Sequence, residues 1–297
     1  ARGGDRSAYS CGEGLSVGTG DDGVSSTSAG DGDGDDGVGD GEADTGIRFD
    51  VGEGDGDGNP DGPTTCDENV DIVFVMDVST SMDAFLDKLA DEILVVDQAL
   101  QALDLPGEPH YGLVVFVDDY ALLLGGAPYP DVQTLRADFL QWSAFTSSNQ
   151  QVGGGNSNYT WTENSLDALY AAATGFQWRP ADSTLRMVIH TTDDTFWEGP
   201  RVANGVQIER GYAETVEALQ QAEVRVFSFT AALGGSCTCE NVTAGWSAPY
   251  MGMDPIPMAT DGAVFPIEEV LSGQLSLSAG INDAVEDKMC MPYPPPG

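Results

Sequence analysis

The sequence predicts an α/β fold with a doubly wound, mostly parallel sheet that is flanked by helices. Apolar, largely β-branched runs alternate with segments in which apolar residues recur at helical spacing. Strands that alternate with helices in this way form a parallel sheet that is covered on both faces. No run approaches the roughly 20 consecutive apolar residues of a membrane-spanning helix. We therefore expect one globular domain built on a buried sheet.

The first 66 residues have a different composition. They contain 16 acidic and 3 basic residues and half of the 38 glycines, so they cannot bury enough apolar surface to offset the entropy lost on ordering. We predict a disordered acidic tether, rich in Gly and Asp, over residues 1–66. The remaining chain is long enough for a hydrophobic core. We predict a domain over residues 67–290 and a Pro-rich tail over residues 291–297.

The first half of the predicted domain begins with a buried strand over residues 70–76, because this run is mostly apolar and largely β-branched. Residues 84–103 predict a helix from apolar positions at helical spacing, and the run HYGLVVFVD predicts a second strand. A short edge strand over residues 120–124 and a helix over residues 132–142 follow. Next comes a polar loop rich in Gly and Asn, SSNQQVGGGNSNYT.

The second half continues the alternation. A helix over residues 163–176 precedes the apolar run LRMVIHTT, and a helix over residues 212–222 precedes the run VRVFSFTA. Each run has the length and the β-branched content of a buried strand. The run AVFPI predicts a last strand, and residues 271–285 a last helix.

The net charge of −38 restricts the partners of this protein. Only 11 Lys and Arg residues oppose 49 Asp and Glu residues. Nucleic acid and anionic membrane surfaces would be repelled, whereas divalent cations would be attracted. We expect no nucleic-acid partner.

The five cysteines predict an exported protein. Because the ends of a domain often lie close together, we predict a disulfide between Cys66 and Cys290, which implies an oxidising compartment. Cys237 and Cys239 predict a local disulfide at a loop tip, since a zinc site needs further Cys or His ligands nearby. Cys11 resembles the lipid-anchored cysteine of bacterial lipoproteins, although the preceding residues ARGGDRSAYS are not apolar.

The alternative for Cys11 is a free or disulfide-bonded thiol. A lipid on Cys11 is the one membrane attachment that we expect. The sequence does not begin with methionine, so we expect that a targeting segment has been removed. The expected location is the cell surface, the outer membrane or the extracellular space.

Polar residues follow two of the predicted strands. The stretch DIVFVMDVSTSM ends its apolar run at Asp77-x-Ser79-x-Ser81, and Asp193 follows the run LRMVIHTT. Ligands of parallel α/β sheets bind beyond the carboxyl ends of the strands, so we expect these side chains at one edge. Carboxylate and hydroxyl oxygens suit a hard cation: Mg²⁺, or Ca²⁺ or Mn²⁺. In the alternative, structural interpretation, Ser79 caps the following helix and Asp77 accepts backbone hydrogen bonds.

These spaced motifs resemble the metal-ion-dependent adhesion site of the von Willebrand factor type A (vWA) family, whose fold is Rossmann-like. That site combines D-x-S-x-S after the first strand, a Thr or acidic residue on a later loop, and an Asp after the fourth strand. Asp77, Ser79 and Ser81 match the first part and Asp193 the last, and the resemblance extends over roughly residues 67–290. It implies that these four residues are metal ligands.

The middle ligand departs from the pattern of most of the family. Glu163 stands where most vWA domains have Thr, and ENSLDAL is similar to the integrin β-subunit variant, whose loop ligand is Glu. The resemblance implies Glu163 as a further ligand, with Thr160 and Thr162 as alternatives. Without a metal role, Glu163 would be a carboxylate at a helix N-terminus that Thr160 or Thr162 caps.

The integrin β pattern also places a second cation beside the first. Asp118 and Asn158 fall at two of its ligand positions, but Thr160 replaces its other aspartate. Ala84 and Phe85 replace the acidic pair of a third cation. The resemblance therefore implies a second cation whose ligand set is incomplete.

Two functions fit such a metal site. In a binding or adhesion module, the cation leaves one coordination position open, and a carboxylate of a protein or glycan partner fills it. In the alternative, a metal-dependent hydrolase, the cation activates water, but the sequence offers only Asp194 as a further group at this edge. A structural envelope protein with a decayed metal site conflicts with the intact D-x-S-x-S. We expect a non-enzymatic binding module.

Overall fold

The computed structural model describes residues 68–232 and 241–295. The predicted tether and the positions of Cys11, Cys66, Cys237 and Cys239 lie outside these residues. Among the described elements, a six-stranded sheet has the order β10-β9-β5-β1-β2-β3. Its strands are β1 (Asn69–Asp77), β2 (His110–Phe116), β3 (Tyr120–Leu122), β5 (Thr184–Thr192), β9 (Arg225–Thr230) and β10 (Ala263–Pro266).

The sheet is mostly parallel, as predicted. Every neighbouring pair is parallel except β2 and β3. Strand β1 lies in the centre, where it pairs with β2 on one side and with β5 on the other. The carboxyl ends of β1 and β5 therefore reach the same edge of the sheet.

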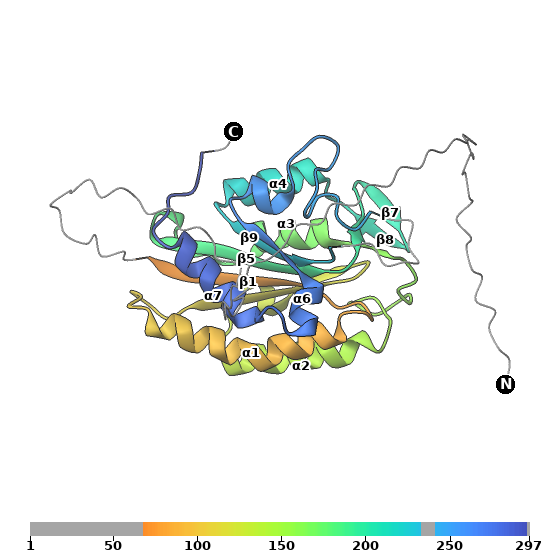
Figure 1. Cartoon of the computed structure of the whole chain (residues 1–297). Helices are drawn as coiled ribbons and strands as arrows, with labels where there is room; N and C mark the ends of the chain where they lie inside the picture. The colour runs from red at the N-terminus through yellow and green to blue at the C-terminus, as the bar shows by residue number, and fades with distance from the viewer. Residues whose placement is uncertain (1–67, 233–240, 296–297) are drawn as a thin grey trace, which may run out of the picture. The chain divides into compact units, whose positions relative to one another are not determined.

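Helices cover both faces of the sheet (Figure 1). One face carries α1 (Asp83–Ala102) and α2 (Val132–Thr146), and the other carries α3 (Ser165–Gly175) and α4 (Tyr212–Gln221). The remaining described helices are α5 (Ile256–Ala259), α6 (Ile267–Ser272) and α7 (Leu277–Lys288), with two short 3₁₀ turns, η1 (Leu123–Gly126) and η2 (Ala181–Ser183). Both α6 and α7 contact α1.

The continuous apolar run of β1 follows from this layering. Successive side chains of a strand point to opposite faces of its sheet. Ile72, Phe74 and Met76 accordingly join the core beneath α1, whereas Val73 and Val75 join the core beneath α3. A strand that is buried on both faces has no polar side, which explains why its sequence shows no alternation.

Two predicted helices differ from the structure, and several short strands were not predicted. Glu163 belongs to the two-residue strand β4 (Thr162–Glu163) and not to a helix, because α3 begins at Ser165. The helix predicted over residues 271–285 is divided into α6 and α7, since Gly273 ends α6 in the left-handed conformation with φ of 77°. Four short strands were not predicted: β4, β6 (Thr195–Phe196), β7 (Arg201–Ala203) and β8 (Val206–Ile208).

The two ends of the described domain lie side by side. The backbone N–H of Cys290 donates to Glu68 Oε2 at 2.8 Å, and Cys290 is disulfide-bonded. Its predicted partner Cys66 lies outside the described residues. The C-terminal segment also contacts the domain, because the Tyr293 ring lies 5.2 Å from the Arg225 guanidinium. None of the described helices has the length and apolarity needed to cross a membrane.

Candidate metal centre

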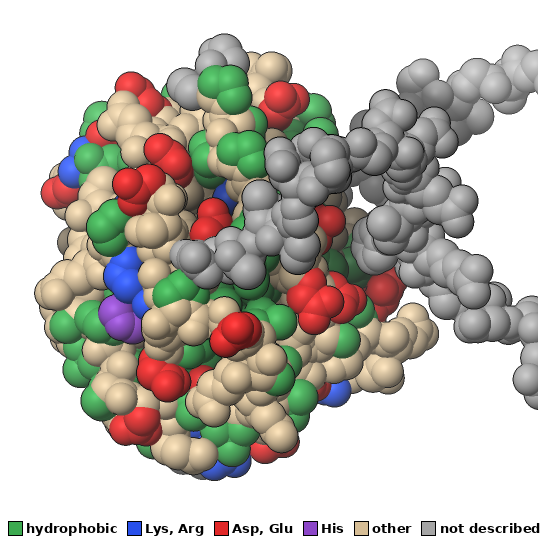
Figure 2. Space-filling view, turned by 90° about the vertical axis from the view of Figure 1, so that its left-hand side faces the viewer, with side chains coloured by type: hydrophobic (Ala, Val, Ile, Leu, Met, Phe, Trp, Pro, Cys, Tyr) green, Lys and Arg blue, Asp and Glu red, His purple; other side chains and the backbone are tan. Residues whose placement is uncertain are grey.

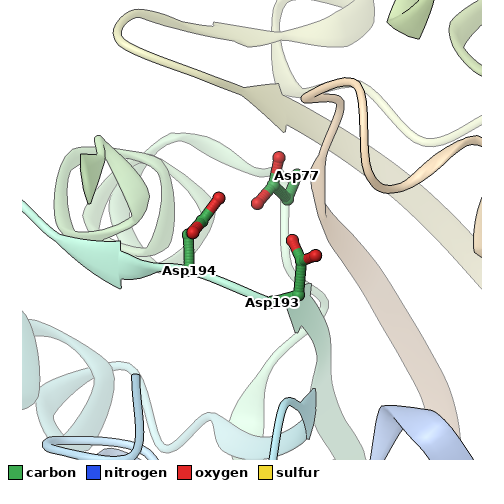
Figure 3. Close-up of side chains that lie close together, drawn as sticks. All are labelled: Asp77, Asp193 and Asp194. Carbon is green, nitrogen blue, oxygen red and sulfur yellow. The ribbon is translucent and has the colours of Figure 1, made fainter. Parts of the chain in front are cut away.

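Three carboxylates converge at the carboxyl edge of β1 and β5. Asp77 is the last residue of β1, and Asp193 and Asp194 directly follow β5. Figure 3 shows their carboxylates pointing toward one another, and one oxygen of each lies within 4.8 Å of the others. We call this group the acidic triad. Among the described residues it is the one group of three or more Asp, Glu, His or Cys close enough to share a metal ion.

The loop after β1 brings two hydroxyl groups to the acidic triad. Ser81 Oγ donates to Asp193 Oδ1 at 2.9 Å, and the hydroxyl oxygens of Ser79 and Ser81 lie 3.1 Å apart. The backbone N–H of Ser79 donates to Asp77 Oδ1 at 2.8 Å. The structure thus joins the two predicted parts, D-x-S-x-S and Asp193, through direct hydrogen bonds.

The alternative, structural interpretation of this loop predicted that Asp77 accepts backbone hydrogen bonds and that Ser79 caps the following helix. The first part is correct and the second is wrong. Asp77 does accept a backbone hydrogen bond, from Ser79. Ser79 does not cap α1, because Met82 occupies the N-cap position and makes no side-chain capping bond. The Ser79 hydroxyl lies beside Ser81 instead.

Thr192 orients two members of the acidic triad, a role that the sequence analysis missed. Its hydroxyl donates to Asp77 Oδ2 at 2.7 Å and accepts the backbone N–H of Asp194 at 3.1 Å. The sequence holds one signal for this role, because Thr192 is a polar residue at the end of an apolar run and stands immediately before an Asp pair.

The triad combines one buried and two half-buried carboxyl groups. Asp77 is fully buried, and this burial, together with the charge of Asp193, raises its pKa from 3.8 to about 7. Burial also raises the pKa of Asp193. Among the ion pairs between described residues, none joins Lys, Arg or His to Asp77 or Asp193. The described part of the chain therefore supplies no paired cationic side chain to these two carboxyl groups.

Glu163 is a fourth carboxylate beside the triad, but it is not a member of the three-residue group. It is 1% exposed, and its Oε1 accepts the Asn158 Nδ2–H at 2.8 Å. Its Oε2 has no hydrogen-bond partner among the described residues. Burial, and next the charge of Asp77, raise the pKa of Glu163 well above its usual value.

Strand pairing holds Glu163 in this place. Glu163 pairs with Phe196 in the parallel pair of β4 and β6, and its carbonyl accepts the Trp197 N–H at 2.9 Å. Strand β6 follows directly after Asp194. The interpretation of Glu163 as a helix-terminal carboxylate capped by Thr160 or Thr162 is wrong, since Asn164 occupies the N-cap position of α3.

Asp118 is the centre of a hydrogen-bonded network. It is fully buried, and its Oδ1 accepts the Thr160 hydroxyl at 2.7 Å. Its Oδ2 accepts Asn204 Nδ2–H at 2.5 Å and Gln151 Nε2–H at 3.5 Å. The side-chain N–H of Asn158 points to Glu163 instead of toward Asp118. These contacts favour a structural role for Asp118, and the second cation stays a prediction without support from them.

The sheet order and its acidic edge define a doubly wound α/β domain with a candidate metal centre. No family model and no curated protein matches this sequence. Among solved structures, an aerotolerance-related membrane protein from Bacteroides fragilis, carrying multiple mutations to serine, is similar at a TM-score of 0.46 and 14% identity. That similarity covers 74% of this chain and all of the other.

A second solved structure, the conserved hypothetical protein BatB from Bacteroides thetaiotaomicron, is similar at a TM-score of 0.44 and 16% identity. It covers 73% of this chain and all of the other.

Proposed function

We propose that this domain binds a divalent cation at the acidic triad and uses it to capture an acidic group of a protein or glycan partner. The observation that carries this proposal is the convergence of Asp77, Asp193 and Asp194 within 4.8 Å of one another, with Asp77 fully buried. Crowded, desolvated carboxylates destabilise one another. A hard divalent cation would neutralise them.

The donor set fits such a cation. The groups at this edge are carboxylate and hydroxyl oxygens, the ligands that Mg²⁺, Ca²⁺ and Mn²⁺ prefer. Glu163 Oε2 supports the fit independently, because a buried acceptor without a hydrogen-bond partner is costly. The ligands that we propose are Asp77, Ser79, Ser81, Asp193 and Asp194, with Glu163 as a further ligand.

Access from solvent supports a binding role. Ser81 is exposed, whereas Asp77 is buried, so the site extends from the interior of the domain to solvent. When bound, the cation would supply an open coordination position for a carboxylate oxygen. The D-x-S-x-S motif and Asp193 resemble the vWA adhesion site, which supports a binding module over an enzyme. The disulfide at Cys290 supports an exported protein.

Calorimetry of the full chain with MgCl₂, CaCl₂ and MnCl₂ tests cation binding. The acidic N-terminal segment also attracts cations, so wild type is compared with Asp77→Asn and with Asp283→Asn. Asp283 is exposed on α7, and its substitution makes the same charge change. We expect Asp77→Asn to remove one saturable site and Asp283→Asn to retain it. Equal titrations of wild type and Asp77→Asn would show that the cations bind elsewhere.

The capture step is tested with the peptides Gly-Asp-Gly and Gly-Asn-Gly, both with blocked termini. We expect the Asp peptide alone to bind, and only at saturating cation. Metal-dependent turnover of p-nitrophenyl acetate or p-nitrophenyl phosphate that disappears in Asp77→Asn would instead favour the hydrolase.

A further inference from the structure

Two exposed aromatic side chains lie on the chain segment that reaches the metal centre. Tyr159 is 79% exposed and Trp161 is 59% exposed, which makes them the two most exposed aromatic residues in the described part of the chain. Single exposed apolar residues are common on protein surfaces. Two large exposed aromatic side chains in one segment, next to the candidate ligand Glu163, are less common and indicate a contact with a partner. We name Tyr159 and Trp161 the aromatic rim.

The exposure of the aromatic rim alternates with burial along the segment. Asn158 and Thr162 are 7% and 8% exposed, and Thr160 is half-buried. The polar side chains of this segment therefore turn inward, and the aromatic ones turn to solvent. This is the reverse of the distribution expected from hydrophobicity alone.

Buried hydrogen bonds fix this inverted arrangement. Thr160 donates to Asp118 at 2.7 Å, and Asn158 donates to Glu163 at 2.8 Å. The backbone N–H of Asn158 donates to the Asn149 carbonyl at 2.9 Å. The aromatic rim is thus presented by an anchored backbone. An anchored aromatic side chain loses little conformational entropy when a partner binds.

The net negative charge of the domain indicates which kind of partner can bind. Residues 68–297 contain 32 acidic and 8 basic residues. Figure 2 shows the end of the sheet that lies opposite β7 and β8 and the metal centre, and there too acidic side chains are scattered while basic ones are few. Of the basic residues, Arg179 and Arg225 are held by Asp71 and Asp261. A second copy of this chain or a polyanionic glycan would be repelled. A partner that brings one carboxylate to the metal must be basic around it.

Aromatic rings bind such a partner well. The face of a Tyr or Trp ring attracts ammonium and guanidinium groups within about 6 Å of its centroid. This chain already makes such contacts, because Arg210 lies 4.0 Å from the Tyr170 ring and Arg201 lies 4.3 Å from the Trp197 ring. The rings of the aromatic rim, by contrast, face solvent.

We propose that the aromatic rim binds Lys or Arg side chains of a basic protein segment whose single carboxylate is captured at the metal centre. This inference rests on the proposed function for the carboxylate, and it adds the class of partner and the residues that select it. Tyr159 and Trp161 would determine specificity, whereas the acidic triad would supply the cation dependence.

The test uses the full chain at saturating MgCl₂ and three peptides with blocked termini: GKGDGKG, GSGDGSG and GEGDGEG. Wild type is compared with the double variant Tyr159→Ala/Trp161→Ala. The control is Met251→Ala/Met258→Ala, which removes two side chains that are 82% and 66% exposed in another segment. We expect wild type and the control to bind the Lys peptide about tenfold more tightly than the Ser peptide. The rim variant should lose most of that preference and retain its affinity for Mg²⁺.

Several results would overturn this inference. Equal preference for the Lys peptide in wild type and the rim variant would show that charge alone selects the partner. Tighter binding of tetragalacturonate than of the Lys peptide would assign a glycan partner, and self-association in sedimentation that the rim variant abolishes would assign a second copy. If the rim variant loses Mg²⁺ binding, the segment serves the metal centre instead. Failure of wild type to bind Mg²⁺ would contradict the proposed function itself, whatever the rim does.

Discussion

Single carboxylates at this edge are held in different ways. Asp77 accepts hydrogen bonds on both oxygens, from Ser79 and Thr192. Glu163 accepts one hydrogen bond on Oε1 and leaves Oε2 without a partner among the described residues. A carboxylate that is desolvated but incompletely hydrogen-bonded has most to gain from a cation. Glu163 therefore offers the sharpest test at the scale of one residue.

Glu163→Gln removes this charge with little change of shape. We expect the metal-free protein to become more stable, because the cost of burying an ionisable carboxyl group beside Asp77 is removed, and the affinity for Mg²⁺ to fall by roughly tenfold. Thermal unfolding in EDTA and calorimetric titration measure the two effects. Glu286→Gln, at an exposed position of α7, is the matched control. Superimposable Mg²⁺ titrations of wild type and Glu163→Gln would exclude Glu163 as a ligand and direct attention to Thr160 and Thr162.

At the scale of elements, one network joins the segment before β4 to the hairpin of β7 and β8. Asp118 accepts hydrogen bonds from Thr160, Gln151 and Asn204. Asn204 lies in the turn of the hairpin and also donates to the Ser157 carbonyl at 3.0 Å. A buried carboxylate that accepts from three side chains fixes the relative position of the segments that carry them.

Asp118→Asn should loosen this network, because an amide nitrogen cannot accept the donors that now point to it. We expect a loss of about 1–3 kcal/mol in the free energy of unfolding and faster amide hydrogen exchange over residues 149–163. Urea denaturation and hydrogen-exchange mass spectrometry measure these changes, with Asp283→Asn as the control. Unchanged exchange in that range would contradict the role of Asp118 as the centre of the network.

The long elements could be predicted from the sequence and the short ones could not. Strand β1 has a continuous apolar run at residues 72–76 because it is buried on both faces, and α1 shows its buried side as a repeat at helical spacing. The two-residue strands β4 and β6 are too short to have a period, and their pairing depends on residues more than thirty positions apart. Glu163 was therefore assigned to a helix that begins two residues later.

The same limit applies to the candidate metal centre. The motif D-x-S-x-S and the Asp after a second strand indicated one shared edge, because the ends of parallel strands are predictable. Whether the Asp194 carboxylate joins the acidic triad depends on how the chain turns after Thr192, and no local sequence pattern shows that turn. The hydrogen bonds to Asp118 likewise depend on the hairpin of β7 and β8, which was not predicted.

At the scale of the whole molecule, the acidic edge makes stability depend on pH. In the folded protein, burial and the charge of Asp193 raise the pKa of Asp77 from 3.8 to about 7. Between these values the folded state holds a proton that the unfolded state releases. The contribution of this group to stability is therefore fully present below pH 3.8 and is lost as the pH rises toward 7.

We expect the metal-free protein to lose up to about 4 kcal/mol of this contribution between pH 4 and pH 7. Saturating Mg²⁺ should oppose the loss, because the cation replaces the proton. Urea unfolding across this range, in EDTA and in MgCl₂, measures both effects. Asp77→Asn should flatten the metal-free profile. Identical metal-free profiles for wild type and Asp77→Asn would contradict the assigned cause.

The central claim is that Asp77, Asp193 and Asp194 share a divalent cation, and the most direct measurement is anomalous diffraction from crystals of the full chain grown with MnCl₂. We predict an anomalous peak between the three carboxylates, with oxygen atoms of at least two of them at about 2.0–2.6 Å. The peak should be absent from Asp77→Asn crystals grown in the same way. A wild-type map with manganese bound elsewhere and no peak between these carboxylates would contradict the claim.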